Sequence, residues 1–231
     1  MEIVVLDAAT LGTDTDLLPL MGQGTVTIWN NTAPEQVAQR IRNAEVIVSN
    51  KVRLMEPVLR EAKKLKLICL SATGYDCVDT AYCARNGIGV CNVPGYSTQS
   101  VAQLTVAMVL ELVNHLSIYR EYVHSGAYSR SGVANALTPV WHELYGKTWG
   151  IVGGGNIGRQ VAKIADAFGC KVLVCRRKPD DLYETVDLDT LCAQSDIISV
   201  HVPLTDETRG MIGEKQLGLM KRDVILVNVA R

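Results

Sequence analysis

Short apolar runs alternate with helix-like segments along the first ninety residues. Five runs have the length and composition of strands, at 3–6, 26–29, 46–48, 67–70 and 88–91. Between them, segments such as 34–43 and 54–64 place apolar residues at helical spacing. This alternation is typical of an α/β fold, in which helices cover both faces of a parallel sheet.

A second series follows a break at 94–98. The break leads into a mostly apolar helix at 100–114, which we expect to be buried, between subunits of a homodimer. Residues 118–147 are predicted to be irregular. Strands then recur at 149–153, 171–175, 196–200 and 224–229. We therefore predict two α/β domains with parallel sheets, at 1–99 and 100–231.

Composition excludes several classes of protein. With 48% hydrophobic and 20% charged residues, the chain of 231 residues is globular rather than disordered. A net charge of −1 argues against a nucleic-acid binder. No apolar run approaches the roughly 18–20 residues that a membrane helix needs. The first residues lack the basic start of a signal peptide, so we expect a cytoplasmic protein.

The seven cysteines and the nearby carboxylates favour no metal or disulfide framework. Most cysteines lie inside apolar runs, and no Cys-x-x-Cys pair occurs, which predicts buried, reduced thiols. Asp76 and Asp79 together offer fewer oxygen ligands than a hard cation requires. Asn50 and Lys51 follow a strand and fit a turn better than a substrate contact. We predict no metal site.

The strongest chemical signal is a G-x-G-x-x-G motif formed by Gly153, Gly155 and Gly158. A strand precedes it, and an amphipathic helix that ends near Gly169 follows it. In this context the first glycine permits a tight turn, the second lets the backbone approach a diphosphate, and the third lets helix and strand pack closely. Free amides at the helix start then face the diphosphate. The alternative is a glycine-rich turn without a ligand.

The residues after the next strand bear on the choice of nicotinamide cofactor. NAD-binding folds place an Asp or Glu there for the ribose 2′-hydroxyl. Here the place holds Arg176, Arg177 and Lys178, and the next carboxylate is Asp180. An arginine offers a planar donor to a 2′-phosphate, so NADP(H) is favoured over NAD(H). A solvated basic loop end without selectivity is the alternative.

Several motifs in order resemble the D-isomer-specific 2-hydroxyacid dehydrogenases. They are Ala-Thr-Gly-Tyr-Asp-Cys-Val-Asp at 72–79, Asn-Val-Pro-Gly-Tyr-Ser-Thr-Gln-Ser-Val-Ala-Gln at 92–103, the glycine motif, Ser-Asp-Ile-Ile-Ser-Val-His-Val-Pro-Leu-Thr at 195–205 and Asn-Val-Ala-Arg at 228–231. Residues 94–98 and 125–130 look most like the glycerate dehydrogenase (hydroxypyruvate reductase) branch. The resemblance implies a flavodoxin-like substrate domain at 1–99 and a Rossmann dinucleotide-binding domain after it.

The resemblance also assigns roles to individual residues. Thr73 and Gly74 would offer backbone donors to a substrate carboxylate, although a simple turn is an alternative. Arg231 matches the catalytic arginine, which would hold the carboxylate and polarise the ketone. As a terminal residue it could equally be solvated. The implied cofactor contacts are Thr105, Asn156, Ile157, His201, Pro203, Val229 and Ala230.

One part of the family pattern is missing from this sequence. The family's acid/base histidine and its carboxylate partner follow the Asn-x-Ala-Arg motif, and none of the four histidines, His115, His124, His142 and His201, lies in a matching motif. We therefore expect a fragment of a longer dehydrogenase that is itself nearly inactive. In the order 3-2-1-4-5-6, strands five and six would be missing, and strand 224–229 would be an exposed apolar edge.

The expected activity is hydride transfer between a nicotinamide cofactor and a small D-2-hydroxy or 2-keto acid. Hydroxypyruvate (glycerate) or glyoxylate fits best. Two alternatives stay open: an NAD(P)-sensing binding protein of the corepressor type, and an inactive fragment that only binds dinucleotide.

Overall fold

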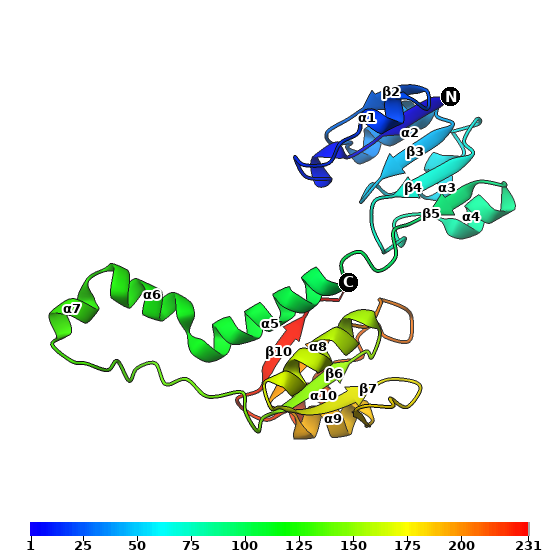
Figure 1. Cartoon of the computed structure of the whole chain (residues 1–231). Helices are drawn as coiled ribbons and strands as arrows, with labels where there is room; N and C mark the ends of the chain where they lie inside the picture. Colours follow the sequence, from blue (N-terminus) through cyan, green and yellow to red (C-terminus); the bar gives the residue numbers. More distant parts are fainter. Residues whose placement is uncertain (231) are drawn as a thin grey trace. The chain divides into compact units, whose positions relative to one another are not determined.

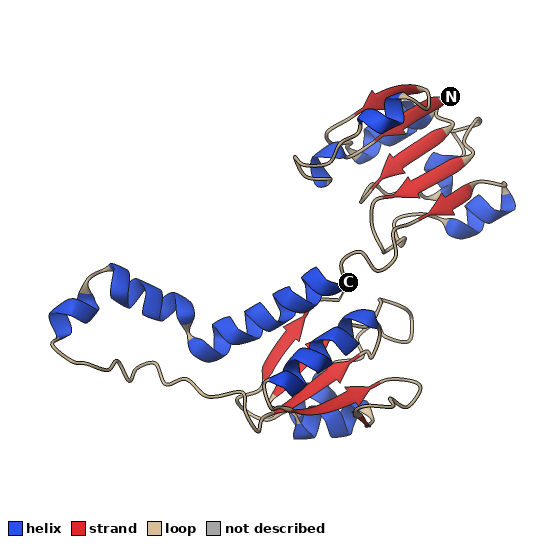
Figure 2. Ribbon diagram, viewed as in Figure 1, coloured by secondary structure: helices blue, strands red, loops and turns tan. Residues whose placement is uncertain are grey.

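The computed structural model describes residues 1–230, and Arg231 lies outside the described residues. The chain divides into two compact units, one from Met1 to Tyr96 and one that begins at Ser97 (Figures 1 and 2). Each unit contains its own parallel sheet of five strands. The predicted α/β fold with two parallel sheets is therefore confirmed, and each unit is described by itself.

The first unit has strand order β2-β1-β3-β4-β5, with every pair parallel. Its strands are β1 (Glu2–Val5), β2 (Thr25–Ile28), β3 (Val46–Ser49), β4 (Leu67–Leu70) and β5 (Gly89–Cys91). Its helices are η1 (Ala8–Thr10), α1 (Leu18–Met21), η2 (Pro34–Gln36), α2 (Val37–Ile41), α3 (Glu56–Leu59) and α4 (Thr80–Arg85). One sheet face supplies Val4, Ile47 and Ile68 to a core closed by Ile41 and Leu59 from the helices.

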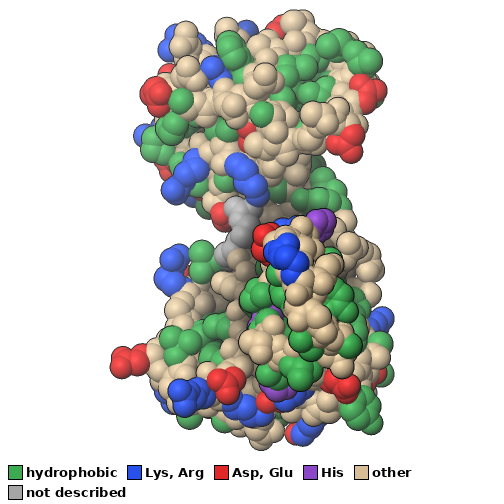
Figure 3. Space-filling view, turned by 90° about the vertical axis from the view of Figure 1, so that its left-hand side faces the viewer, with side chains coloured by type: hydrophobic (Ala, Val, Ile, Leu, Met, Phe, Trp, Pro, Cys, Tyr) green, Lys and Arg blue, Asp and Glu red, His purple; other side chains and the backbone are tan. Residues whose placement is uncertain are grey.

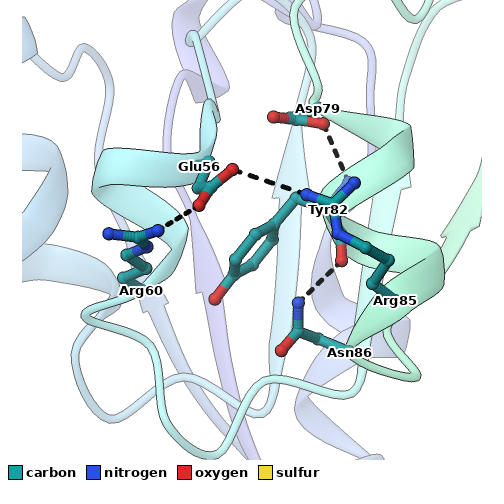
Figure 4. Close-up of polar contacts among 6 residues, drawn as sticks. All are labelled: Glu56, Arg60, Asp79, Tyr82, Arg85 and Asn86. Carbon is teal, nitrogen blue, oxygen red and sulfur yellow. Dashed lines mark hydrogen bonds and ion pairs between the residues drawn. The ribbon is translucent and has the colours of Figure 1, made fainter.

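Helix α4 is fixed at its start and tied to α3 by polar contacts (Figure 4). The Asp79 carboxylate caps α4 by accepting a hydrogen bond of 2.8 Å from the Tyr82 amide. Glu56 of α3 pairs with Arg60, directly after this helix, and with Arg85 of α4, at 3.5 Å in the second pair. Asp79 is thus the helix cap that ends the 72–79 motif.

Replacing Asp79 by Ala should lower the free energy of unfolding by about 1 kcal/mol, because loss of an N-cap side chain leaves a helix amide without its acceptor. Urea denaturation measures this effect. The matched control is Asp181→Ala, at an exposed carboxylate of the second unit, which should change stability by less than about 0.5 kcal/mol. Equal stability of Asp79→Ala and the wild type would contradict the capping role.

The second unit has strand order β10-β9-β6-β7-β8, again all parallel. Its strands are β6 (Thr148–Val152), β7 (Lys171–Cys175), β8 (Glu184–Thr185), β9 (Ile197–Val200) and β10 (Ile225–Asn228). Its helices are α5 (Thr98–Asn114), α6 (Leu116–His124), α7 (Ala127–Ser131), α8 (Asn156–Ala167), α9 (Leu188–Gln194) and α10 (Glu214–Leu219). Trp149 and Ile151 of β6 face the core with α5 and α8, whereas Val152 faces the core with α9.

Three expectations about the elements are wrong, two of them in the second unit. Residues 118–147 are not irregular throughout, because α6 and α7 form there as an arm beyond α5 (Figure 1). The fifth Rossmann strand is not missing, because β10 takes its position. The third position is taken by the two-residue β8, which the sequence does not predict. A strand of two residues has no apolar run for a sequence pattern to reveal. In the first unit, the helix expected at 54–64 spans only Glu56–Leu59.

Within the single chain, α5 buries one stripe, with Ala102, Val106 and Val109 inside, while Leu104 and Leu112 are more than half exposed. Burial of the exposed side of α5 between subunits stays a prediction. The cysteines are not uniformly buried. Cys91 is exposed on edge strand β5, and Cys69 and Cys175 are half-buried.

Among residues 1–230, no single helix is long and apolar enough to cross a bilayer. Helices α5 and α6 reach that length together only across a bend of 60°.

Candidate active site

The glycine turn lies at the C-terminal end of β6, in the second unit. Gly153 has φ of +102°, which glycine adopts readily and other residues avoid. A Cβ on Gly158 would lie 2.0 Å from the Gly153 carbonyl oxygen, so only glycine lets α8 pack against the turn. A Cβ on Gly155 would meet nothing within 4 Å. The turn is therefore tight on two sides and open at Gly155.

Helix α8 begins at this opening without a side-chain cap. Its first amides, from Asn156 and Ile157, have no partner inside the helix, as at any helix start. Together with the helix dipole, such amides bind anions. The open space at Gly155 and the uncapped helix start fit a dinucleotide's diphosphate.

A hydrogen-bonded chain supports the turn from the neighbouring strand. Trp149 Nε1 donates to Ser199 Oγ at 3.0 Å, and Ser199 Oγ lies 2.9 Å from His201 Nε2. Because Trp149 can only donate, the serine hydroxyl is free to donate its own proton to Nε2. This assignment puts the ring proton of neutral His201 on Nδ1, which is buried and has no partner among the described residues.

Burial lowers the pKa of His201 to about 4. The ring is therefore neutral at pH 7, and its proton-accepting nitrogen is occupied by Ser199. A group in this state does not exchange protons with a substrate near neutral pH. The structure places His201 beside the turn, where its carbonyl carbon would lie 3.0 Å from a Cβ on Gly153.

At the end of β7, Arg176 lies over the glycine turn. A Cβ on Gly154 would lie 2.8 Å from Arg176 Cδ. Asp180, which the sequence places four residues beyond, folds back and pairs with Arg176 at 2.5 Å and with Arg159 of α8 at 3.3 Å. Arg177 has a side chain that is 95% exposed, and its ion pair with Glu207 is 4.0 Å long.

Asp180 holds this cluster together. Its side chain is 1% exposed. Burial alone would raise the pKa of Asp180, but the Leu182 amide and the Arg176 guanidinium outweigh burial and lower the pKa below its usual value. Two guanidinium groups against one carboxylate leave a net positive charge at the end of β7.

The other residues predicted to contact the cofactor differ in their exposure to solvent. Pro203 is exposed, and Val229 and Ala230 are half-buried at the end of β10. Thr105 does not fit its predicted role, because it is fully buried and its hydroxyl donates to the Val101 carbonyl inside α5. Arg231, the predicted catalytic residue, lies outside the described residues.

In the first unit, Thr73 and Gly74 lie on the loop after β4. The Thr73 hydroxyl donates to the Val93 carbonyl at 2.9 Å, and Asn92 Nδ2 donates to the Thr73 carbonyl at 2.7 Å. Among residues 1–230 the amides of Thr73 and Gly74 donate to no protein group, and both residues are exposed. Two free neighbouring amides on a fixed loop can bind a carboxylate.

The sequence reading missed the residue that fixes the next loop of this sheet edge. Asp7 is buried at the end of β1, and its carboxylate accepts hydrogen bonds from the amides of Asn50 and Lys51 at 2.7–3.1 Å. The 50–51 segment is thus a turn with satisfied amides, as the sequence favoured. A lone Asp after a strand gives no sequence signal of a partner 43 residues away.

Comparison with known proteins decides the family. The model of the D-isomer specific 2-hydroxyacid dehydrogenase NAD binding domain matches residues 106–231. A hydroxypyruvate reductase of Blautia hydrogenotrophica is 34% identical over 244 aligned residues, covering 100% of this chain and 74% of that protein. The chain belongs to the D-isomer-specific 2-hydroxyacid dehydrogenase family.

Other curated relatives and solved structures are also similar to this chain. A glycerate dehydrogenase of Methylorubrum extorquens is 38% identical over 86% of this chain, which spans 62% of that relative's length. The structure of D-lactate dehydrogenase from Aquifex aeolicus with NAD and lactic acid matches with a TM-score of 0.84 and 30% identity, covering 100% of this chain and 69% of that one. An acyclic imino acid reductase in complex with NADPH and D-Arg matches with a TM-score of 0.87 and 27% identity, covering 100% and 75%. The family fold thus includes complexes with either nicotinamide dinucleotide.

Proposed function

We propose that this chain carries the cofactor site and part of the substrate site of an oxidoreductase that reduces a small 2-keto acid, with hydroxypyruvate and glyoxylate as the best candidates. The glycine turn carries this proposal, because it combines the open position at Gly155 with an uncapped helix of 12 residues. The relatives named glycerate dehydrogenase and hydroxypyruvate reductase support the substrate class. The seven cysteines are free thiols in the structure, which suits a reducing, cytoplasmic compartment.

A bound nicotinamide dinucleotide supplies or accepts the hydride. The chain's own residues bind and orient. The first amides of α8 hold the diphosphate, and the free amides of Thr73 and Gly74 hold the substrate carboxylate. Arg231 is proposed, from the family pattern, to hold that carboxylate and polarise the ketone. Among the described residues, His201 is held neutral and is not the proton donor.

The direct test measures binding and turnover separately. Titration with NADPH or NADH, followed by cofactor fluorescence, should show saturable binding to this chain. A panel of 2-keto acids then tests oxidation of the bound cofactor. Binding without oxidation of any keto acid would favour the corepressor-type or binding-only alternatives, and absence of binding to either dinucleotide would refute the proposal.

We also propose NADP(H) as the preferred cofactor. Arg176 lies against the glycine turn and is held in place by Asp180, so its guanidinium is preorganised beside the position of an adenosine ribose. The Asp180 carboxylate is engaged by two arginines, so it repels a 2′-phosphate less than a free Asp would.

Replacing Arg176 by Asp should weaken NADPH binding by about 10–100-fold, because a hydrogen bond between charged groups contributes about 1.5–3 kcal/mol. NADH binding should change little or improve. Fluorescence titration with both cofactors measures the ratio of the two dissociation constants. The comparison variant is Arg177→Ala, at a side chain that is almost fully exposed and should contribute less. An unchanged ratio in Arg176→Asp would mean that Arg176 does not contact the ribose phosphate.

The arm favours a homodimer. Large apolar side chains exposed along α6, α7 and the segment after them are Leu116, Ile118, Val123, Tyr128, Val133, Leu137, Val140 and Trp141. Figure 3 views the protein from the arm side and shows hydrophobic side chains at the surface. Contiguous apolar surface of this kind marks protein–protein contacts. Sedimentation equilibrium should give twice the monomer mass, and a monomer at micromolar concentration would contradict the dimer.

A further inference from the structure

Two cysteines of the first unit occupy directly opposed positions on neighbouring strands. In the parallel pairing of β4 and β5, Cys69 lies opposite Cys91. Their neighbours Ile68 and Val90 are also opposed, and both pack into the core on one face of the sheet. Because successive side chains of a strand point to opposite faces, Cys69 and Cys91 both point to the other face.

That face is accessible at this edge of the sheet. Cys91 is exposed on the edge strand, and Cys69 is half-buried beside it. Burial raises the pKa of the Cys69 thiol, and its neighbour Cys91 raises that pKa further. A thiol reagent from solution therefore reaches Cys91 first. Cys69 lies beside it and is placed to react with a disulfide formed on Cys91.

The spacing of neighbouring strands suits a covalent bond between these residues. Strands in a sheet lie about 4.8 Å apart. Disulfides join Cα atoms about 4.4–6.8 Å apart, with Cβ atoms near 3.8 Å. The Cα spacing is within this range, but the Cβ atoms must approach each other. Closing the bond therefore draws β5 toward β4 on the cysteine face.

Strand β4 leads into the loop that carries Thr73 and Gly74, and β5 leads into a segment that is hydrogen-bonded to this loop. Asn92, directly after Cys91, donates to the Thr73 carbonyl. The Val93 amide donates to the Ala72 carbonyl at 3.0 Å, and the Thr73 hydroxyl donates to the Val93 carbonyl. Three hydrogen bonds thus clamp the two segments together within four residues of the cysteine pair.

We propose that Cys69 and Cys91 form a reversible dithiol–disulfide site that takes a low-molecular-weight disulfide as its oxidant and changes the clamp between residues 72–73 and 92–93. The Cys91 thiolate attacks the oxidant RSSR, which gives a Cys91–S–S–R mixed disulfide and releases RSH. The Cys69 thiolate then attacks Cys91 Sγ, which forms the Cys69–Cys91 bond and releases the second RSH. Excess thiol reverses both steps.

The test treats the reduced chain with oxidised glutathione and counts the remaining thiols. Two of the seven thiols should be lost, with a mass decrease of two hydrogen atoms and no retained glutathione. Peptide mapping should join the segments that contain Cys69 and Cys91, and dithiothreitol should restore all thiols. Cys69→Ser should stop at a glutathione adduct on Cys91, and Cys91→Ser should form no cross-link. Cys83→Ala, at a buried cysteine of the same unit, should react like the wild type.

Hydrogen exchange measures the effect on the clamp. In the oxidised wild type, the Val93 amide should exchange about tenfold faster than in the reduced form, whereas amides of β1 should be unchanged. If Thr73 and Gly74 bind the substrate as proposed above, oxidation should also raise the KM for the keto acid and leave cofactor affinity unchanged. A persistent glutathione adduct in the wild type, or a cross-link to another cysteine, would overturn the site. A cross-link that leaves the exchange rate of the Val93 amide unchanged would overturn the proposed effect of the disulfide on the loop. Neither result depends on turnover.

Discussion

Replacing Gly155 by Val is expected to abolish dinucleotide binding while leaving the fold intact. Gly155 has φ of −78° and ψ of −166°, a conformation that residues with a side chain adopt without strain. A Cβ there meets no protein atom within 4 Å, so the valine extends into the space proposed for the diphosphate. We expect an increase of at least about 100-fold in the dissociation constants for NADPH and NADH, since a side chain there separates the phosphates from the α8 amides.

Two further glycine variants separate this effect from loss of structure. Gly158→Ala should lower stability by at least about 3 kcal/mol, because its Cβ would overlap the Gly153 carbonyl oxygen at 2.0 Å. Gly218→Ala, on exposed α10 with no atom near its Cβ, should keep both stability and cofactor binding. Calorimetric binding and urea denaturation of all three variants distinguish the roles. Full dinucleotide affinity in a folded Gly155→Val protein would disprove the proposed cradle.

The strand–turn–helix around residues 149–169 could be predicted because each of its signals is local. Glycine spacing, helical periodicity and the cap at Gly169 all lie within about 20 residues and agree with one another. The same holds for the strands of the first unit. Local signals of this kind identified the α/β fold and the positions of both sheets.

The features that the sequence did not predict depend on contacts between distant segments or on very short elements. The β8 strand has two residues, and its pairing with β7 is what defines it. Helix α6 of the arm exposes Leu116, Ile118 and Val123, so the rule that helices bury their apolar side chains does not predict it. The carboxylate contacts of Asp7 and Asp79 differ for the same reason: Asp79 binds an amide three residues away, whereas Asp7 binds an amide 43 residues away.

The site residues show the same division. Gly153, Gly155 and Gly158 are defined by backbone geometry that their spacing encodes. Thr105 was assigned from a family pattern, but its packing inside α5 depends on how that helix meets the sheet. Arg176 was placed correctly at the end of β7, whereas the return of Asp180 onto it requires the turn between β7 and β8.

The half-buried His201 beside the turn, with its Nδ1 buried, should make the second unit sensitive to acid. The pKa of His201 is about 4 in the folded protein because of burial, and the ordinary value is 6.5. The folded state therefore binds a proton less readily than the unfolded state. The resulting stability is complete above pH 6.5 and is lost as the pH falls from 6.5 toward 4. Over that range the loss is about 3 kcal/mol for this one group.

Protonation also breaks the hydrogen-bonded chain in the core. A charged ring carries protons on both nitrogens, so Nε2 no longer accepts from the Ser199 hydroxyl, which already accepts from Trp149. The charge would lie in a buried position without a carboxylate among its hydrogen-bond partners. Loss of an acceptor and desolvation of a cation therefore act in the same direction.

Urea denaturation at pH 7 and at pH 4 tests this argument in a His201→Gln variant, whose side chain does not titrate. Other groups titrate equally in both proteins, so the wild type should lose about 3 kcal/mol more than the variant between the two pH values. His124→Gln, at an exposed histidine of α6, should lose as much as the wild type. If His201→Gln and the wild type lost the same stability, the imidazole would have to be accessible to solvent or paired with an acid in the folded protein. Either arrangement would give the Nδ1 proton a partner. Burial would then no longer explain why the imidazole of His201 is neutral.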